Sequence, residues 1–367
     1  MIQTIGILGG GQLGRMMALA AREMGYGIVV LDPTPNCPCG QIADKQIVAE
    51  FDDAEAAKEL LESCDVITYE FEIVNLSVGK ALAEKLPQTS RLLEITQNRI
   101  VEKEEIRNAG LETVEYFAIT STDSLEKFVI DYKNNPRKLI IKTSQGGYDG
   151  KGQYVINHIK DLSLFEKVSY NPKIQYVAED FAQFEKELSV IVCRNKNGEV
   201  SVFPVAENIH KNQILFQSII PARVSEDVEK MAITVARQLA AHLNLVGTLA
   251  IELFLCGDKL IVNELAPRPH NSGHYTMNAC ITSQFEQHIR AVCNLSLGDA
   301  KLISPCVMLN ILGEDTHLMN RENIGKHKLH LYGKAEAKVG RKMGHINVLG
   351  DSVEKCLREV EKLVNNN

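Results

Sequence analysis

The chain has 367 residues, of which 45% are hydrophobic and 24% are charged. This composition is typical of a soluble globular protein, and the length predicts two to three domains. The net charge of -7 argues against general nucleic-acid binding, which needs clustered Lys and Arg. No apolar stretch approaches the ~18–20 residues that span a bilayer, no secretory leader is visible, and the odd count of nine scattered cysteines fits reduced thiols. We therefore expect a cytoplasmic protein with no membrane partner.

The first hundred residues alternate between strand and helix patterns. Short apolar runs predict strands at 4–8, 27–31, 47–49 and 65–69, and helices are predicted at 13–24 and 53–62. Alternation of this kind is typical of an open parallel sheet. The region is about half as long as a complete two-lobed dinucleotide domain.

A Gly-x-Gly-x-x-Gly motif follows the first predicted strand. It consists of Gly9, Gly11 and Gly14, and Asp32 stands at the end of the next strand. Alone, this is the fingerprint of an NAD- or FAD-dependent oxidoreductase. The same backbone can hold any phosphate at a helix N-terminus, so a nucleotide substrate is the alternative.

The middle of the chain predicts an α+β region with antiparallel pairs. Helices are predicted at 97–109 and 228–242, and strands at 115–118, 139–142, 175–179, 188–193, 200–205, 247–255 and 259–264. From about residue 304 the chain is β-rich, with strands at 307–311, 329–332 and 345–349 and a final helix at 353–364. We expect three domains, at 1–96, 97–303 and 304–367.

The most glycine-rich run is QGGYDGKGQ at 145–153. Its backbone N–H groups can converge on phosphate oxygens, and Lys142 and Lys151 add positive charge. The spacing is not that of a Walker loop. A surface hairpin is the alternative.

Two acidic residues lie in an apolar hairpin. Glu252 is inside the first strand, and Asn263 and Glu264 end the second. A carboxylate in such a strand is costly unless it is paired or bound to a cation, and this set of oxygens suits Mg²⁺. A salt-bridged Glu is the alternative. The loop that follows, with Arg268, His270, Asn271, Ser272 and His274, is rigid and rich in donors, and it suits an anion.

Four motifs together resemble the ATP-grasp superfamily and, within it, the N5-carboxyaminoimidazole ribonucleotide synthetases. They are GGGQLGRM at 9–16, YEFE at 69–72, GGYDGKGQ at 146–153 and NELAPRPHNSGH at 263–274. The resemblance covers essentially the whole chain. It implies an N-terminal Rossmann-like pre-ATP-grasp domain, a central ATP-grasp domain and a small β-rich C-terminal domain. It also implies an ATP- and bicarbonate-dependent ligase that carboxylates aminoimidazole ribonucleotide in purine biosynthesis, with Mg²⁺ and as a homodimer.

The resemblance assigns roles residue by residue. It implies catalytic roles for Lys151, Arg268, His270, Asn271, Ser272 and His274, and Mg²⁺ on Glu252 and Glu264. It implies an ATP site of Arg99, Lys142, Gly147, Tyr148, Asp149, Gly150, Lys151, Gly152, Gln153, Glu179, Asp180, Phe181, Ala182, Glu187, His210, Asn263 and Glu264. It implies a ribonucleotide site of Gly11, Gln12, Leu13, Glu70, Glu72, Tyr148, Lys338, Arg341 and Lys342. The lid cation is often Arg in this family and is Lys151 here.

Three other functions are weighed against this one. Another ATP-grasp ligase, such as the formate-using glycinamide ribonucleotide transformylase, shares the fold and the metal pair. An NAD-dependent oxidoreductase would use the first glycine motif. A non-catalytic binding protein would have no reason to combine Lys142, Glu252, Asn263 and Glu264.

Overall fold

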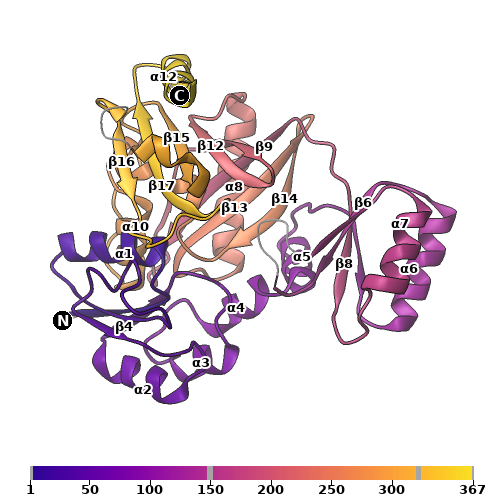
Figure 1. The fold of residues 1–367 in the computed structure, drawn as a ribbon, viewed down its shortest axis with the longest axis horizontal. Helices are drawn as coiled ribbons and strands as arrows, with labels where there is room; N and C mark the ends of the chain where they lie inside the picture. The colour runs from indigo at the N-terminus through magenta and orange to yellow at the C-terminus, as the bar shows by residue number, and fades with distance from the viewer. Residues whose placement is uncertain (1–2, 147–151, 320–323, 366–367) are drawn as a thin grey trace.

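The structure is a computed structural model, which describes residues 3–146, 152–319 and 324–365 (Figure 1). Its strands form three sheets. Within these residues, no helix has both the length and the apolar character needed to cross a bilayer.

The N-terminal sheet is parallel and open, as predicted. Its four strands lie in the order β3-β2-β1-β4. The third strand lies two residues earlier than predicted, because pairing ends at Ile47 and Val48 is exposed. Two short helices, α3 and α4, were not predicted, since tertiary burial and not length stabilises them. The elements are β1 (Thr4–Leu8), α1 (Gln12–Glu23), β2 (Gly27–Leu31), β3 (Lys45–Ile47), α2 (Ala54–Ser63), β4 (Val66–Tyr69), α3 (Leu76–Ala81), α4 (Ser90–Thr96) and α5 (Arg99–Asn108).

The second sheet forms a small lobe, which Figure 1 shows on the right, apart from the rest of the molecule. Its antiparallel strands lie in the order β5-β8-β6-β7. The glycine-rich run connects β6 to β7. These two strands pair antiparallel, with Lys142 opposite Gln153. The elements are β5 (Tyr116–Ile119), α6 (Thr122–Asn134), β6 (Leu139–Thr143), β7 (Gln153–Ile156), α7 (Ile159–Leu164), the π-helix η1 (Phe165–Ser169) and β8 (Tyr176–Asp180).

The third sheet has nine strands in the order β14-β13-β9-β11-β12-β15-β17-β16, with β10 on β9. Helix α8 packs on β9 and β13 through an apolar face that includes Val228, Ala232 and Leu239. The sheet runs across the expected boundary at 304, because β15 pairs with β12. The strands are β9 (Lys186–Arg194), β10 (Val200–Val202), β11 (Ala206–Lys211), β12 (Ile214–Ile220), β13 (Gly247–Cys256), β14 (Lys259–Ala266), β15 (Cys306–Leu312), β16 (Lys328–Leu331) and β17 (Lys342–Leu349).

The hairpin of β11 and β12 was not predicted. Its turn places Asn212 and Gln213 at φ +50° and +65°, a conformation that sequences usually mark with Gly. Without a Gly, the turn was invisible in the sequence. The remaining elements are α8 (Glu226–His242), the 3₁₀ helix η2 (Asn271–Gly273), α9 (Thr276–Ala279), α10 (Gln284–Val292), the 3₁₀ helix η3 (Gly313–Met319) and α12 (Val353–Asn365).

Candidate active site

The predicted metal carboxylates face each other across one hairpin. Glu252 on β13 pairs in register with Glu264 on β14, and the next pair is Leu253 with Val262. Asn263 is therefore the extra residue of a β-bulge, which re-aims a side chain. Its Nδ2 lies 3.4 Å from Oε2 of Glu252, so all three side chains converge.

This trio fits a divalent cation. Burial and the charge of Glu264 raise the pKa of Glu252 to about 7, which is the cost of holding two carboxylates together without a counter-charge. Carboxylate and amide oxygens are the ligands that Mg²⁺ prefers. A cation between the two carboxylates would relieve that cost.

A second charged cluster lies on the small lobe. Glu179 on β8 accepts from Lys142 on β6 at 2.6 Å through one oxygen, and pairs with Lys103 on α5 at 3.0 Å through the other. Burial would raise the pKa of Glu179, but the two ammonium groups hold it low. Lys142 is thus fixed in place, while Glu179 itself is engaged inside the protein.

The two strands that flank the glycine-rich run lie next to Arg99 and contain Lys142. The guanidinium of Arg99 donates to the carbonyl of Thr143 at 3.1 Å. Gln153 pairs with Lys142 across the hairpin, and the carbonyl of Gly152 accepts from Thr143. Five of the predicted lid residues lie outside the described residues: Gly147, Tyr148, Asp149, Gly150 and Lys151.

A cavity of about 160 Å³ joins the parts of this site. It lies between the large sheet, the N-terminal region and the start of the hairpin. Its lining includes Glu264 and Arg99 on one side and Glu72 on another. The residues around it are Glu72, Ile73, Thr96, Gln97, Arg99, Gln145, Gly146 and Glu264.

An ion pair connects the N-terminal segment to the loop after β14. Arg268 donates to Glu72 through two nitrogens, Nε to Oε2 at 2.5 Å and Nη2 to Oε1 at 3.1 Å. Burial would raise the pKa of Glu72, but Arg268 holds it below its usual value. Such a bidentate pair sets orientation as well as charge.

The loop after β14 divides its predicted residues between the site and the core. Nδ1 of His270 accepts from the N–H of Ser272 at 3.3 Å, so the neutral ring carries its proton on Nε2, 3.7 Å from Glu252. Burial and the charge of Arg268 lower the pKa of His270 well below its usual value. Asn271 is buried, and neither amide atom has a hydrogen-bond partner among the described residues. An orphaned amide in this loop is suited to a polar ligand.

His274, for which the resemblance implies a catalytic role, is buried in the structure. Its ring is buried, with its centroid 4.7 Å from that of His345 and 6.1 Å from that of Tyr332. Its Nδ1 lies 3.2 Å from Nε2 of Gln284. Burial lowers its pKa well below the usual value. The residue helps pack the C-terminal strands against the loop, because helix η2 turns its side chain inward.

The first glycine motif does bind an anion at the start of α1, but that anion belongs to the protein. The carboxylate of Glu70 accepts from the N–H groups of Gly11 at 2.5 Å and Gly14 at 2.7 Å. A Cβ on Gly11 would lie 2.5 Å from Glu70 Oε1, so this close approach requires glycine. The resemblance implies a substrate site at Gly11, Gln12 and Leu13, but in this structure Glu70 takes the N–H of Gly11, and the side chain of Leu13 is in the core.

Asp32 is likewise engaged internally. It accepts from the N–H of Gly10 at 2.8 Å and of Thr34 at 2.8 Å. In a dinucleotide site the corresponding acid would bind ribose. With the helix terminus and the acid both occupied, and a sheet of four strands, the NAD-dependent oxidoreductase hypothesis is not supported.

Basic residues of the C-terminal region lie beside Glu70. Burial and the charges of Arg341 and Lys342 lower the pKa of Lys334 to about 8, while Glu70 works against that shift. Gln41 of the N-terminal domain donates to the carbonyl of Gly333 at 2.8 Å and holds this segment in place. Lys334, Arg341 and Lys342 therefore concentrate positive charge beside Glu70, which favours the binding of an anion.

Lys334 was missed by the sequence reasoning, which named Lys338. Lys338 is exposed and pairs with Glu336 at 3.0 Å. The sequence contains both lysines in one polar loop, and no local signal separates them. Only the packing of that loop makes Lys334 half-buried and leaves Lys338 exposed.

The other residues predicted to bind the nucleotide lie in the segment after β8 and on β9 and β11. Asp180 pairs with Arg137 at 2.7 Å, and the backbone N–H of Phe181 donates to the backbone carbonyl of Lys138. Ala182 follows at the start of the link to β9. Glu187 on β9 pairs with His210 on β11. Burial alone would lower the pKa of His210, but the bond to Glu187 outweighs it and raises that pKa.

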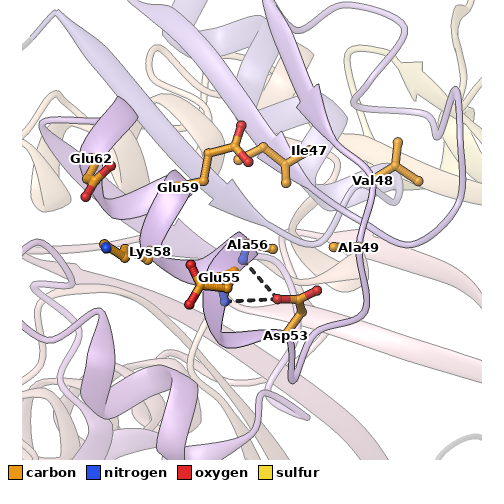
Figure 2. A pocket seen from close by; sticks show the side chains of 9 residues that line it. All are labelled: Ile47, Val48, Ala49, Asp53, Glu55, Ala56, Lys58, Glu59 and Glu62. Atoms are coloured by element: carbon orange, nitrogen blue, oxygen red, sulfur yellow. Dashed lines mark hydrogen bonds between the residues drawn. The ribbon is translucent and has the colours of Figure 1, made fainter.

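A larger hollow of about 440 Å³ lies on the surface beside α2 (Figure 2). Four of its nine lining residues are acidic, Asp53, Glu55, Glu59 and Glu62, against one lysine, Lys58. Asp53 caps α2 by accepting from the N–H groups of Glu55 and Ala56, as the dashed lines in Figure 2 show. An acidic surface repels phosphates, so the smaller cavity is the candidate active site.

Comparisons with other proteins agree with this geometry. Residues 104–285 match the ATP-grasp domain, residues 2–97 the ribonucleotide synthetase preATP-grasp domain, and residues 306–359 the phosphoribosylaminoimidazole carboxylase C-terminal domain. The chain is 48% identical to the N5-carboxyaminoimidazole ribonucleotide synthase of Bacillus subtilis (strain 168), over 97% of this chain and 94% of that protein.

Two solved structures are also similar. N5-carboxyaminoimidazole synthetase from Staphylococcus aureus, complexed with ADP, is 41% identical with a TM-score of 0.90, covering 98% of this chain and 97% of that one. The Aspergillus clavatus enzyme, in complex with ADP and 5-aminoimidazole ribonucleotide, is 31% identical with a TM-score of 0.90, covering 99% and 98%.

The matched ATP-grasp region contains both the small lobe with Lys142 and the hairpin with Glu252 and Glu264, which makes the chain an ATP-grasp ligase. The identity to relatives extends over all three matched regions. The chain belongs to the N5-carboxyaminoimidazole ribonucleotide synthase family.

Proposed function

We propose that this chain carboxylates 5-aminoimidazole ribonucleotide to N5-carboxyaminoimidazole ribonucleotide, using ATP and bicarbonate, in purine biosynthesis. One observation carries the proposal: the cavity that places Glu264 and Arg99 of the nucleotide side beside Glu72 of the N-terminal side. Activation of bicarbonate and its capture by an amine can then occur next to each other. Membership of the family supports the same substrates.

On the nucleotide side, Lys142 and Arg99 bind phosphates, and the predicted lid from Gly147 to Gln153 covers them. Glu187 holds the ribose hydroxyls beside His210, and the segment Glu179–Ala182 contacts adenine through its backbone. Glu252 and Glu264, with Asn263, would hold Mg²⁺, which would supply positive charge to the phosphates. This assignment is supported by the carboxylate pair and its raised pKa at Glu252.

Bicarbonate binds in the loop after β14. Arg268 supplies charge, and His270, Asn271 and Ser272 supply donors. An oxygen of bicarbonate attacks the γ-phosphorus of ATP. The bond between the γ-phosphorus and the oxygen that bridges it to the β-phosphate breaks. The products are carboxyphosphate and ADP, which departs with that oxygen. Lys142 and Arg99 offset the charge of the two anions that must meet.

The ribonucleotide binds on the N-terminal side, with its phosphate on Lys334, Arg341 and Lys342. Its exocyclic amine attacks the carboxyl carbon of carboxyphosphate. The bond from that carbon to the phosphate oxygen breaks, and the departing phosphate takes the amine proton. The predicted lid cation, Lys151, closes over the reaction and excludes water.

Lys334→Met is expected to raise the KM for the ribonucleotide by roughly 10–100-fold, as expected for one lost hydrogen bond to a charged group. The KM for ATP should change little, because Lys334 lies beside Glu70 and not beside Lys142. Steady-state kinetics would measure both constants. A larger effect from Lys338→Met than from Lys334→Met would contradict the assignment and return the phosphate to the exposed lysine.

The function itself is tested by ADP release from Mg-ATP. We expect release to require the ribonucleotide and to scale with bicarbonate, and formate not to replace bicarbonate. Release that ignores the ribonucleotide would show that the acceptor is another amine. Dependence on formate would favour the transformylase reaction instead.

The homodimer and the cytoplasmic location expected from the sequence stay predictions. Sedimentation equilibrium of the purified protein would test the first, and cell fractionation the second.

A further inference from the structure

A buried hydrogen-bonded network crosses from the N-terminal domain to the large sheet, outside the residues assigned so far. It joins Thr68 on β4, Gln88 between α3 and α4, His288 on α10, the backbone N–H of Thr248 on β13 and the carbonyl of Pro267. We call these five residues the Thr68 network. The side chains of Thr68, Gln88 and His288 are at most 1% exposed.

Every hydrogen bond in the Thr68 network has a fixed direction. The N–H of Thr248 donates to Nδ1 of His288 at 3.2 Å, so the neutral ring carries its proton on Nε2. That proton is donated to Thr68 Oγ1 at 2.8 Å. The hydroxyl of Thr68 donates to Gln88 Oε1 at 2.5 Å, and Gln88 Nε2 donates to the carbonyl of Pro267 at 3.0 Å.

The surroundings keep this arrangement in place. Burial lowers the pKa of His288 to about 3, so the ring stays neutral and Nδ1 stays an acceptor. Gly247 has φ +104°, and a Cβ there would lie 3.1 Å from the ring of His288 and 3.3 Å from Gln88. The network is therefore closely packed, and a buried network that is fully satisfied specifies one geometry.

Two members of the Thr68 network lie close in sequence to the ion pair of the active site. Pro267 directly precedes Arg268, and Thr68 lies four residues before Glu72 on one segment of the N-terminal domain. Gln97 holds the same segment through bonds of 2.6 Å to the carbonyls of Glu72 and Val74. Hydrogen bonds of the Thr68 network therefore connect the segment that carries Glu72 to the loop that carries Arg268.

We propose that Thr68, Gln88 and His288 are positioning residues that hold Arg268 against Glu72 and so align the bicarbonate loop with the ribonucleotide domain. The inference rests on the proposed function. Its consequence is that a broken network lets ATP be consumed without carboxylation, because activated bicarbonate forms where the amine does not reach it.

Two variants break the Thr68 network at different bonds. Thr68→Val replaces the hydroxyl by a methyl of similar size, and Thr68→Ser keeps the hydroxyl. Gln88→Met removes the bond to Pro267. A matched control is Gln287→Met on the same helix as His288, because Gln287 is also fully buried, and its side chain bonds to Gly298 at 2.6 and 2.7 Å and to Ser201 at 3.1 Å, away from the N-terminal domain.

The experiment measures ADP and carboxylated product in one reaction, the KM for bicarbonate and for ATP, and the melting temperature. For Thr68→Val and Gln88→Met we expect the KM for bicarbonate to rise roughly fivefold to tenfold, the size of one lost buried hydrogen bond. The ratio of ADP to product should also rise, with the KM for ATP within twofold of wild type. In Thr68→Ser the KM for bicarbonate and the ratio of ADP to product should stay at their wild-type values. Gln287→Met should lower only the melting temperature.

Unchanged coupling and unchanged KM for bicarbonate in Thr68→Val, or changes equal to those of Gln287→Met, would overturn the inference and leave the proposed function intact. A wild-type enzyme that releases no ADP with ribonucleotide and bicarbonate would overturn the proposed function, and this inference with it. If Gln88→Met does not fold, the comparison of Thr68→Val with Thr68→Ser decides alone.

Discussion

Glu264→Gln is expected to lower kcat by roughly 10²–10³-fold, the loss seen when one group that stabilises developing charge is removed. Glu264 is in register with Glu252 across the hairpin, and an amide in its place keeps the shape but halves the negative charge offered to a cation. The variant should need a higher Mg²⁺ concentration for half-maximal activity. Titration of initial rate against Mg²⁺ at saturating ATP would measure both effects.

The matched control for this prediction is Glu185→Gln. Glu185, just before β9, accepts from the N–H of Gly257 at 3.0 Å in the turn of the same hairpin, so it tests whether the loss of any carboxylate that contacts the hairpin has the same effect. We expect its kcat within threefold of wild type. A Glu264→Gln enzyme with more than a third of the wild-type kcat and the same Mg²⁺ requirement would contradict the metal assignment.

Arg268→Lys is expected to lower kcat/KM for bicarbonate by roughly 10²-fold, as for about 3 kcal/mol of lost charge-assisted hydrogen bonding. The guanidinium uses two nitrogens on Glu72 and a third, Nη1, on the carbonyl of Pro269 at 3.3 Å. A lysine keeps the charge but cannot form this fork. Bicarbonate dependence of product formation would measure the change.

The pairing with Glu72 is tested by a double-mutant cycle. Glu72→Gln alone and Arg268→Lys alone each disturb the same pair, so the double variant should lose less than the sum of the two effects. The KM for ATP serves as the internal control and should stay within threefold. Additive losses would mean that the two residues act independently and that their ion pair does not orient the loop.

Some of the site was accessible from local sequence pattern. The turn Cys-Gly-Asp-Lys places two apolar strands antiparallel, and this brings Glu252 close to Asn263 and Glu264 on the facing strand. The parallel N-terminal sheet followed from short apolar strands alternating with helices. In both cases the deciding contacts lie close in the sequence, where backbone geometry alone restricts the outcome.

Other parts needed the tertiary structure. Regular pairing counted from the turn would place Glu252 opposite Asn263, and only the bulge brings Glu264 into register with Glu252. The glycine motif predicted an anion at the start of α1, but the anion is Glu70, a carboxylate 56 and 59 residues further along the chain. Competition for a helix terminus depends on which group folding brings near, and no local pattern contains that information.

The sequence by itself determined the family, the carboxylate hairpin, the lysine on the small lobe and the donor-rich loop, because each is a compact motif whose spacing carries its chemistry. The fold decided that His274 packs in the core, that Lys334 and not Lys338 lies beside Glu70, and that Thr68, Gln88, Thr248 and His288 form one network. Those outcomes depend on burial and on contacts between segments far apart in the sequence, such as Thr68 and His288, which are 220 residues apart. Side-chain type alone does not show which of several similar residues becomes buried.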